Sequence, residues 1–347
     1  MEVERPATTL NRTLKIWKYL GLWDGGTNKT IYKYYSYTFI FMLLILYNIQ
    51  QTISLIYTPR KVEIMIKEVT FYFNVVAITI NVVMIMIHKK TIVEVLVTLD
   101  SEEFQGTDDI TNEIIKKDMA KYKIYWKGLM GLGNFAYIMK DIVPIIANFA
   151  ISSYQISLPT FNYFFLNETT KNDYFSWLFA YEIVAIYAVM LYDVTSDIFM
   201  NGILFYSITQ MKILNYRLRN LKAEINVELS TEDQEIIHVM ELNKCLRHYD
   251  SILKYCSDIQ SITRVIMFVK YGLGSTIICV LLCGLLLSQE LVFAAYNSDW
   301  IPRTEPFKRS IKVFMERAKT PIVMVGLKLF PLSLETFTSV SLLQKYF

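Results

Sequence analysis

Residues 36–57 read SYTFIFMLLILYNIQQTISLIY, a run of 22 residues without Asp, Glu, Lys or Arg. The hydrocarbon core of a bilayer is about 30 Å thick, so a helix that crosses it needs roughly 20 mostly apolar residues. This run meets that requirement, and we predict that it spans a membrane. The residues before it are polar and charged, so we expect no signal peptide, and the first span itself must serve as the targeting signal.

Five further segments meet the same requirement: 69–88, 128–151, 177–198, 262–287 and 321–343. Charged residues make up 19% of the chain, below the roughly 25% of a soluble domain. The sequence therefore predicts an all-α polytopic membrane protein with six evident transmembrane helices. The long linker 199–261 has helical periodicity and alternating charge, so it should extend the fourth and fifth helices beyond the membrane.

Lysine and arginine set the orientation of the spans. They are frequent in the N-terminal arm and in the linker 89–127, whereas the loop 152–176 contains only Lys171. Because cytoplasmic loops carry the excess of basic residues, we expect an intracellular N-terminus and an external 152–176 loop. That loop also contains the tripeptide Asn167-Glu168-Thr169, an acceptor pattern for glycosylation, so Asn167 is predicted to carry a glycan.

The segment 288–320 conflicts with this count of spans. Its basic residues are Arg303, Lys308, Arg309, Lys312, Arg317 and Lys319. Five spans from an intracellular N-terminus would place the segment outside, which is the wrong side for so many basic residues before a membrane helix. Either the topology differs from this count, or one span is missing between residues 271 and 290.

Several stretches resemble the insect odorant receptor family. The most specific are SQELVFAAYNSDW at 288–300 and KLFPLSLETFTS at 328–339; weaker ones are LKIWKYLGLWD at 14–24, DIFMNGILFYSITQMKILNYRLRNL at 197–221 and CLRHYDSILKYCSDI at 245–259. The resemblance covers nearly the whole chain. It implies seven transmembrane helices, an intracellular N-terminus, and a cytosolic anchor before the last helix.

The resemblance also implies a function. Members of this family form tetrameric cation channels gated by small volatile organic ligands, usually with a shared co-receptor subunit. The expected localisation is the plasma membrane of sensory neuron dendrites. In this reading the domains are 1–287 (five transmembrane helices and the ligand-binding bundle), 288–320 (the anchor) and 321–347 (a truncated, pore-type last helix).

Two departures from the family pattern stand out. The family places a sixth helix between the positions of Gly284 and Ser288, where this chain has none, and it continues well beyond the VSLLQKYF at 340–347. An incomplete gene model or a splice form would explain both. We therefore expect this polypeptide, as written, not to gate on its own.

Ligand binding requires an apolar cavity with a few polar groups inside the helix bundle. The candidates lie in the second, third and fourth spans and are Tyr72, Phe73, Tyr137, Ile138, Ile142, Trp177, Tyr181 and Glu182. Two structural alternatives stay open. The aromatic residues could pack between helices or form an interfacial belt, and Glu182 could pair with Lys140, with Asp141 pointing elsewhere.

No enzyme is predicted, and no cofactor. Cys245, His248 and Cys256 lack the further Cys/His pair that would complete a metal site. A net charge of +3 without blocks of like charge gives no nucleic-acid surface. The open alternatives are a non-conducting form that only pairs with the co-receptor and a gustatory-type receptor channel. A G-protein-coupled receptor or a transporter fits less well, because their motifs and repeats are not seen.

Overall fold

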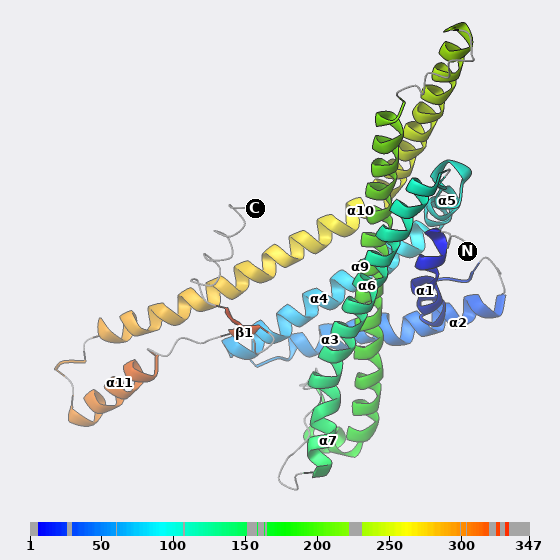
Figure 1. Ribbon diagram of the computed structural model, residues 1–347. Helices are drawn as coiled ribbons and strands as arrows, with labels where there is room; N and C mark the ends of the chain where they lie inside the picture. The colour runs from blue at the N-terminus through cyan, green and yellow to red at the C-terminus, as the bar shows by residue number, and fades with distance from the viewer. Residues whose placement is uncertain are drawn as a thin grey trace. The chain divides into compact units, whose positions relative to one another are not determined.

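A computed structural model describes residues 6–25, 30–59, 61–106, 108–150, 158, 163, 165–221, 231–298, 300–302, 304–318, 324–326 and 330–332 (Figure 1). The chain divides into two compact units. The first unit contains residues 1–57 and 74–270, and the second contains 58–73 and 271–347. Each unit is described by itself below.

Four helices of the described chain are long and apolar enough to cross a membrane: Thr30–Ile56, Ile64–Ile87, Asp109–Ala147 and Phe175–Arg219. They cover most of the first four predicted spans; Tyr57, His88 and residues 148–151 of those spans lie beyond them. The first is built from α2 (Thr30–Ile40), a π-helical turn η1 (Phe41–Ile45) and α3 (Leu46–Ile56), and the second is α4 (Val62–Ile87). The third is built from α6 (Asp109–Tyr137), a second π-helical turn η3 (Ile138–Ile142) and α7 (Val143–Ala150). Such π-helical turns are rare and are often found at functional sites.

In the linker 199–261, residues 199–219 continue one neighbouring helix and residues 231–261 belong to the next, whereas the placement of this linker in the cytosol stays a prediction. The fourth span belongs to α9 (Phe175–Arg219), which has 45 residues, and the next helix, α10 (Thr231–Tyr296), has 66. At 1.5 Å per residue these helices are about 68 and 99 Å long. Both are far longer than the roughly 30 Å thickness of the hydrocarbon core of a bilayer.

The remaining elements are shorter: α1 (Pro6–Tyr19), α5 (Lys89–Leu99), the 3₁₀ turn η2 (Glu102–Phe104), α8 (Glu168–Asp173), α11 (Glu305–Ala318), β1 (Met324–Gly326) and β2 (Phe330–Leu332). The two strands pair antiparallel, with Val325 opposite Pro331. A helix was predicted here, within 321–343, and these strands replace it in the part of that range that is described. Proline lacks the N–H of a helix interior and glycine disfavours one, which accounts for the difference at Pro331 and Gly326.

The predicted boundary between the fifth span and the anchor, at residues 287 and 288, does not coincide with the end of a helix. The predicted fifth span, 262–287, does not end at a loop, because α10 continues through Ser288 as far as Tyr296. The fifth apolar run and the first residues of the predicted anchor therefore belong to one continuous helix. Within the described range 231–298, no separate sixth helix lies between them.

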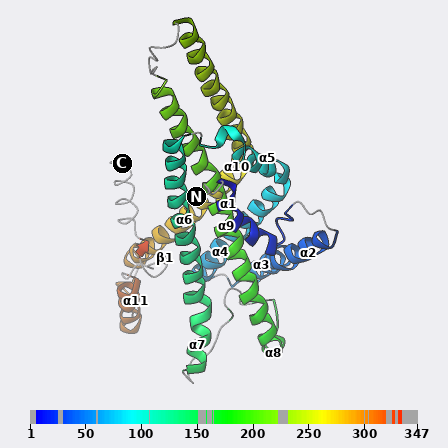
Figure 2. The same cartoon turned by 45° about the vertical axis from the view of Figure 1, so that its right-hand side comes forward.

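In the first unit α6 packs along α9, and α1 packs against both (Figures 1 and 2). Trp17 of α1 is fully buried. Its indole Nε1 donates to Thr195 Oγ1 over 3.0 Å, and its ring centroid lies 4.6 Å from that of Phe199. Trp126 of α6 donates to Thr13 of α1 over 3.0 Å. The N-terminal helix is therefore part of the core of this unit.

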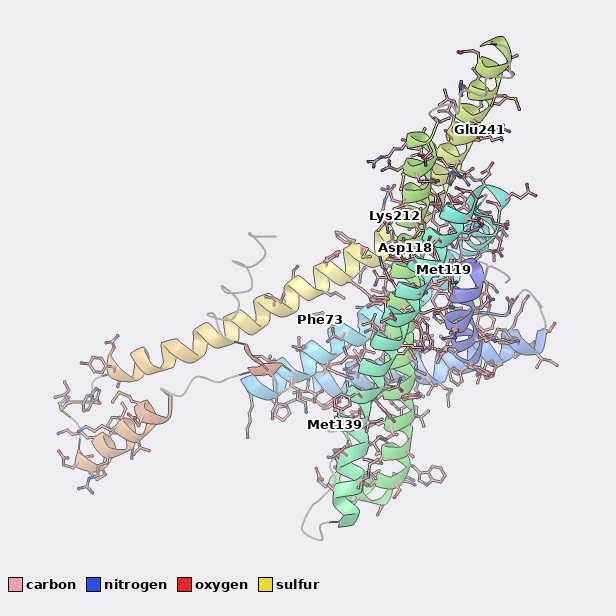
Figure 3. The ribbon with its side chains drawn as sticks, viewed as in Figure 1. Phe73, Asp118, Met119, Met139, Lys212 and Glu241 are labelled. Carbon is pink, nitrogen blue, oxygen red and sulfur yellow. The ribbon has the colours of Figure 1, made fainter. Side chains whose placement is uncertain are left out.

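Farther along α6, a buried carboxylate joins the same two helices. Asp118 is 4% exposed and accepts hydrogen bonds from Lys212 Nζ (2.7 Å) and Thr209 Oγ1 (3.1 Å) of α9. Figure 3 shows Asp118 and Lys212 on these neighbouring helices. A shift of one helix along the other would separate these partners and leave a buried charge unpaired, which is costly. The pair therefore favours one relative register of α6 and α9.

Candidate ligand-binding site

A cluster of tyrosines surrounds Glu182 in the first unit. Glu182 and Tyr47 are fully buried, and Tyr163 is 1% exposed. The Tyr163 hydroxyl lies beside the Glu182 carboxylate. The ring of Tyr181 is centred 6.4 Å from that of Tyr47, and its hydroxyl donates to the carbonyl of Met42 over 2.8 Å. We call these four residues, Tyr47, Tyr163, Tyr181 and Glu182, the Glu182 cluster.

One face of α3 continues the cluster with polar side chains. Tyr47, Gln51 and Ser54 recur at i, i+4 and i+7 and therefore share a face, and Gln51 and Ser54 are at most 1% exposed. Both amide atoms of Gln51 are buried without a hydrogen-bond partner in the described part of the chain. An unpaired buried polar group costs about 1–3 kcal/mol, and this amide retains its capacity to donate and to accept a hydrogen bond.

Tyr163 reaches the cluster through a strained backbone. Its φ is 41°, in the left-handed region, which costs an ordinary residue roughly 1–2 kcal/mol. Its carbonyl accepts from the Leu166 amide over 2.9 Å and closes a turn. Burial, and next the Glu182 carboxylate, raise the pKa of the Tyr163 phenol. The phenol therefore stays protonated at neutral pH and can donate a hydrogen bond.

Comparison with known proteins gives the family. A sequence model described as 7tm odorant receptor matches residues 61–290 and 285–342. The chain belongs to this family. The matched family consists of receptors, not enzymes. The two matched stretches overlap at 285–290, near the place where the sequence predicts a missing helix.

Individual odorant receptors are similar at low identity. Odorant receptor 22b of Drosophila melanogaster is 23% identical over 244 residues, which are 60% of this chain and 59% of that receptor. Odorant receptor Or2 of Anopheles gambiae is 22% identical over 166 residues, 38% of this chain and 44% of its own length. This chain thus spans about three fifths or less of these relatives.

Solved structures share the fold. The insect olfactory receptor OR5 from Machilis hrabei, determined in complex with eugenol, superposes with a TM-score of 0.62 at 16% identity, over 97% of this chain and 96% of that one. The same receptor determined in another structure gives a TM-score of 0.61. At this identity the similarity establishes the all-helical odorant receptor fold.

The predicted ligand residues of the fourth span divide into two groups. Tyr181 and Glu182 belong to the Glu182 cluster, whereas Trp177 is 78% exposed and lies outside it. Five residues on an α-helix correspond to a rotation of about 140°. When Glu182 faces the interior of the unit, Trp177 therefore faces away.

Of the predicted residues on the third span, Tyr137 makes the clearest contacts with α9. Its hydroxyl donates to the Ile183 carbonyl over 3.2 Å, and its ring lies 4.8 Å from that of Tyr187. Ile142 is half-buried, while Ile138 is 47% exposed and does not face the interior.

The charged residues of η3 are placed differently from the prediction. Lys140 was expected to face the interior and Asp141 to point elsewhere on the helix, but Asp141 is 3% exposed and Lys140 is exposed. The π-helical turn that contains both changes the rotation per residue, which the α-helical projection of the sequence did not include. The pairing of Lys140 with Glu182 stays a prediction.

Tyr72 and Phe73, predicted on the second span, lie in the second unit. Both are half-buried on α4, and their ring centres are 5.9 Å apart. They contact each other, and their role in a ligand site stays a prediction.

Sequence reasoning missed Tyr47, Gln51 and Tyr163. A signal existed for Gln51, because polar residues at membrane depth usually face the interior of a bundle. For Tyr163 there was none, since no local pattern in the sequence around it indicates burial.

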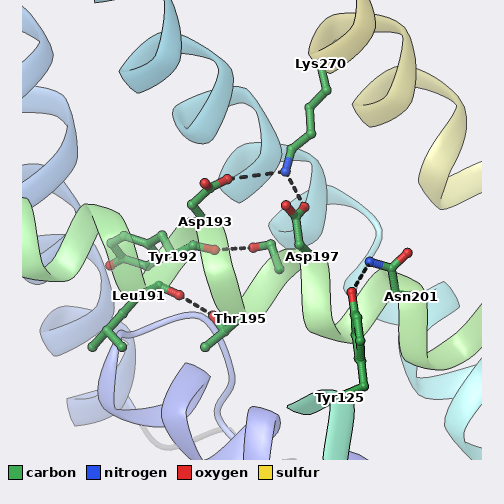
Figure 4. Close-up of polar contacts among 9 residues, drawn as sticks. Tyr125, Leu191, Tyr192, Asp193, Thr195, Asp197, Asn201 and Lys270 are labelled. Carbon is green, nitrogen blue, oxygen red and sulfur yellow. Dashed lines mark hydrogen bonds and ion pairs between the residues drawn. The ribbon is translucent and has the colours of Figure 1, made fainter. Parts of the chain in front are cut away.

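A second group of polar residues joins α9 to α10 (Figure 4). Lys270 lies 3.3 Å from Asp193 and also pairs with Asp197, which is one helical turn farther along α9. Asn201, one further turn along, donates to the Tyr125 hydroxyl of α6 over 2.7 Å. Lys270 is one of two basic residues in the predicted fifth span, and nothing local in the sequence links it to these aspartates.

Proposed function

We propose that this odorant receptor chain is a tuning subunit of a ligand-gated cation channel, and that small volatile molecules bind at the Glu182 cluster. The observation that carries the proposal is the combination of buried aromatic rings with a buried carboxylate and an unpaired amide in one unit. Ligand sites are mostly apolar with a few placed polar groups, and this cluster has that composition.

The cluster also suggests how a ligand is selected. The rings of Tyr47 and Tyr181 provide apolar surface that binds by shape, whereas Tyr163, Glu182 and Gln51 provide hydrogen-bonding groups. A site built around buried polar groups rejects ligands that leave those groups unpaired. We therefore expect ligands with one hydroxyl, carbonyl or amine group to be preferred over pure hydrocarbons.

The test compares two conservative variants in cells that also express the co-receptor. Tyr163→Phe removes the buried hydroxyl, while Tyr174→Phe removes one from a tyrosine that is 59% exposed. Tyr163→Phe should shift the concentration for half-maximal current about tenfold for ligands with a polar group, because a buried hydrogen bond is worth roughly 1–1.5 kcal/mol. Tyr174→Phe should leave it unchanged. Equal dose–response curves for both variants across the ligand panel would remove this cluster as the site.

Pairing with the co-receptor in a hetero-tetramer is supported by an exposed stripe on α10. Val239, Leu242, Leu246, Tyr249 and Leu253 recur at alternating spacings of three and four, and each is 43–51% exposed. This is the spacing of a coiled-coil seam. We assign this stripe to the contact between subunits.

Changing Leu242, Leu246 and Leu253 to Gln should reduce co-purification with the co-receptor severalfold, because interface energy is concentrated in a few apolar anchors. The matched control changes Ile237 and Met240, which are exposed on the same helix but off the stripe. Full recovery of the complex with the stripe variant would show that the contact lies elsewhere.

A second candidate is a chain that pairs with the co-receptor without conducting. It is favoured by the continuous α10 and by a family match in two stretches that overlap at 285–290. A version with a sixth helix inserted between Gly284 and Ser288 should give odorant-evoked current with the co-receptor, whereas the 347-residue form should not. Ligand-tuned current from the 347-residue form, absent with the co-receptor alone, would exclude this candidate.

We further propose an intracellular N-terminus and residence in the plasma membrane of sensory neuron dendrites. The basic residues of the N-terminal arm and of the linker 89–127 support this orientation. Asn167 is exposed immediately before α8, so its side chain is accessible for a glycan. The family match supports an odorant rather than a gustatory role.

A further inference from the structure

The π-helical turn η1 adds one residue to a turn of the first span. The amide of Leu46 donates to the carbonyl of Phe41, five residues before it, whereas an α-helix uses the carbonyl four residues before. Each residue turns an α-helix by about 100°. The inserted residue therefore redirects every side chain that follows it in the span.

This redirection lets one span pack against two different surroundings. Ser36, before η1, is buried and donates to the carbonyl of Gly21 in the N-terminal turn. Ser54, after η1, is buried on the face of α3 that contains Tyr47, whose ring is centred 6.4 Å from that of Tyr181. Eighteen positions separate Ser36 from Ser54, which is about five complete turns of an uninterrupted α-helix. Without η1 both serines would point in one direction.

A side chain of α9 holds η1 in place. The Tyr181 hydroxyl donates to the carbonyl of Met42, inside the turn, over 2.8 Å, and η1 packs against α9. Because a π-helical turn departs from the regular pattern of an α-helix, it is rare, and within a membrane span no water replaces a donor that is lost. A hydrogen bond from a second helix therefore stabilises η1. Tyr181 also belongs to the Glu182 cluster, so one phenol serves both the cluster and the turn.

The second π-helical turn is tied to the same stretch of α9 in a different way. Tyr137, directly before η3, donates its hydroxyl to the Ile183 carbonyl over 3.2 Å. This hydrogen bond ends on α9 and not inside a π-helical turn. Tyr137 is therefore a matched control for Tyr181.

We propose that η1 regulates the Glu182 cluster: Tyr181 holds the turn at its place, and a ligand that accepts the Tyr181 hydrogen bond releases the turn to shift along the first span. A shift toward Ile56 turns each residue that it passes by about 100°. Tyr47, Gln51 and Ser54 then change direction, whereas the residues before η1 do not. This inference rests on the proposed function, since the ligand is the one bound at the cluster.

The first test measures distances in the full chain in nanodiscs, with its four cysteines replaced and labelled chain diluted in unlabelled chain. One spin label is placed by Ile208→Cys on α9, and the other by Ile53→Cys after η1 or by Tyr37→Cys before it; all three positions are exposed. 2-Heptanone, whose carbonyl only accepts hydrogen bonds, should shift the 53–208 distance by roughly 5–8 Å, because a helix is about 10 Å across. The 37–208 distance should not change, and n-heptane should shift neither distance.

Two pairs of variants test the turn without ligand. Tyr181→Phe should give the shifted 53–208 distance in the absence of 2-heptanone, whereas Tyr137→Phe should not. Deletion of Met42 removes the inserted residue, so it should give a continuous α-helix that folds with a similar melting temperature and no longer responds to 2-heptanone. Deletion of Leu204, an exposed residue of the continuous helix α9, should prevent folding, because it turns one half of that helix by about 100° against the other.

Three results would overturn the proposal. If 2-heptanone raises the melting temperature but the 53–208 distance stays the same with the ketone and in Tyr181→Phe, the ligand binds without moving the turn, and the proposed function stands. If the Met42 deletion fails to fold in the same way as the Leu204 deletion, η1 is not a removable insertion. If 2-heptanone changes neither the melting temperature nor any distance, binding at the Glu182 cluster fails, and this inference fails with it.

Discussion

At the scale of single residues, His248 shows how an imidazole is held neutral. It is 1% exposed on α10. Arg217 Nη1 lies 3.2 Å from His248 Nδ1 and can only donate, so Nδ1 accepts, and Nε2–H donates to Gln210 Oε1 over 3.1 Å. Gln210 in turn donates to the Phe104 carbonyl over 2.9 Å. One neutral tautomer therefore joins α9, α10 and η2.

This arrangement predicts a loss of stability in acid. Burial, and next the charge of Arg217, lower the pKa of His248 from 6.5 to about 4, while Glu103 acts in the opposite direction. The unfolded chain therefore binds a proton that the folded chain rejects. The stabilisation is complete above pH 6.5 and is lost as the pH falls toward 4, by up to about 3 kcal/mol.

The measurement is thermal unfolding of the purified chain at several pH values between 7.5 and 4. His248→Gln should flatten the decrease in melting temperature between pH 6.5 and 4. His238→Gln, on the same helix, should reproduce the decrease of the unchanged protein. Identical pH profiles for all three proteins would contradict the assignment.

Gly202 carries a second prediction at this scale. A Cβ at this position of α9 would lie 2.7 Å from the Tyr122 hydroxyl and 2.9 Å from Cδ2 of Leu10. Both distances are too short, so Gly202→Ala should lower the free energy of unfolding by about 1–3 kcal/mol through overpacking. At Gly131 of α6, by contrast, an added Cβ would meet no described atom within 4 Å, so Gly131→Ala should be neutral or stabilising by up to about 1 kcal/mol. Thermal unfolding of the two variants side by side checks the difference in sign.

At the scale of elements, Lys270 connects two long helices. Its ammonium pairs with Asp193 and Asp197 of α9. Removing the ammonium leaves two carboxylates one turn apart without their shared cation. Because charges are poorly solvated near membrane depth, this loss should exceed that of an ordinary surface ion pair, which is at most about 1 kcal/mol.

We expect Lys270→Met to lower the melting temperature, and the further changes Asp193→Asn and Asp197→Asn to restore part of it. Lys254→Met, which removes an exposed lysine of the same helix, serves as the control. A double-mutant cycle between positions 270 and 197 gives the coupling free energy, expected at about 1–2 kcal/mol. Strict additivity of the two changes would mean that the pair contributes no stability.

At the scale of the whole molecule, the orientation in the membrane is a prediction of its own. An epitope at residue 2 should bind antibody only after cells are permeabilised, and glycosidase treatment should increase the gel mobility of the unchanged chain but not that of Asn167→Gln. Both results follow from the distribution of Lys and Arg along the first four spans. Labelling of intact cells at residue 2 would reverse the topology.

The sequence by itself determined the helical class, the four helices that are long and apolar enough to cross a membrane, and the great length of α9 and α10. These features depend on local properties, namely apolar length and helical periodicity, which a chain carries wherever its parts lie. The same local reasoning identified Tyr181 and Glu182 as candidate ligand residues of the fourth span, because a carboxylate within an apolar span has to be buried or paired.

Only the tertiary structure decided which residues meet. Tyr163, whose backbone is in the left-handed region, lies beside Glu182, and Asp141 is buried within the π-helical turn η3. Lys270 is 77 residues from Asp193 in sequence, and no periodicity links them. Contacts of this kind depend on packing between distant segments, and a single change in helical rotation redirects every side chain after it.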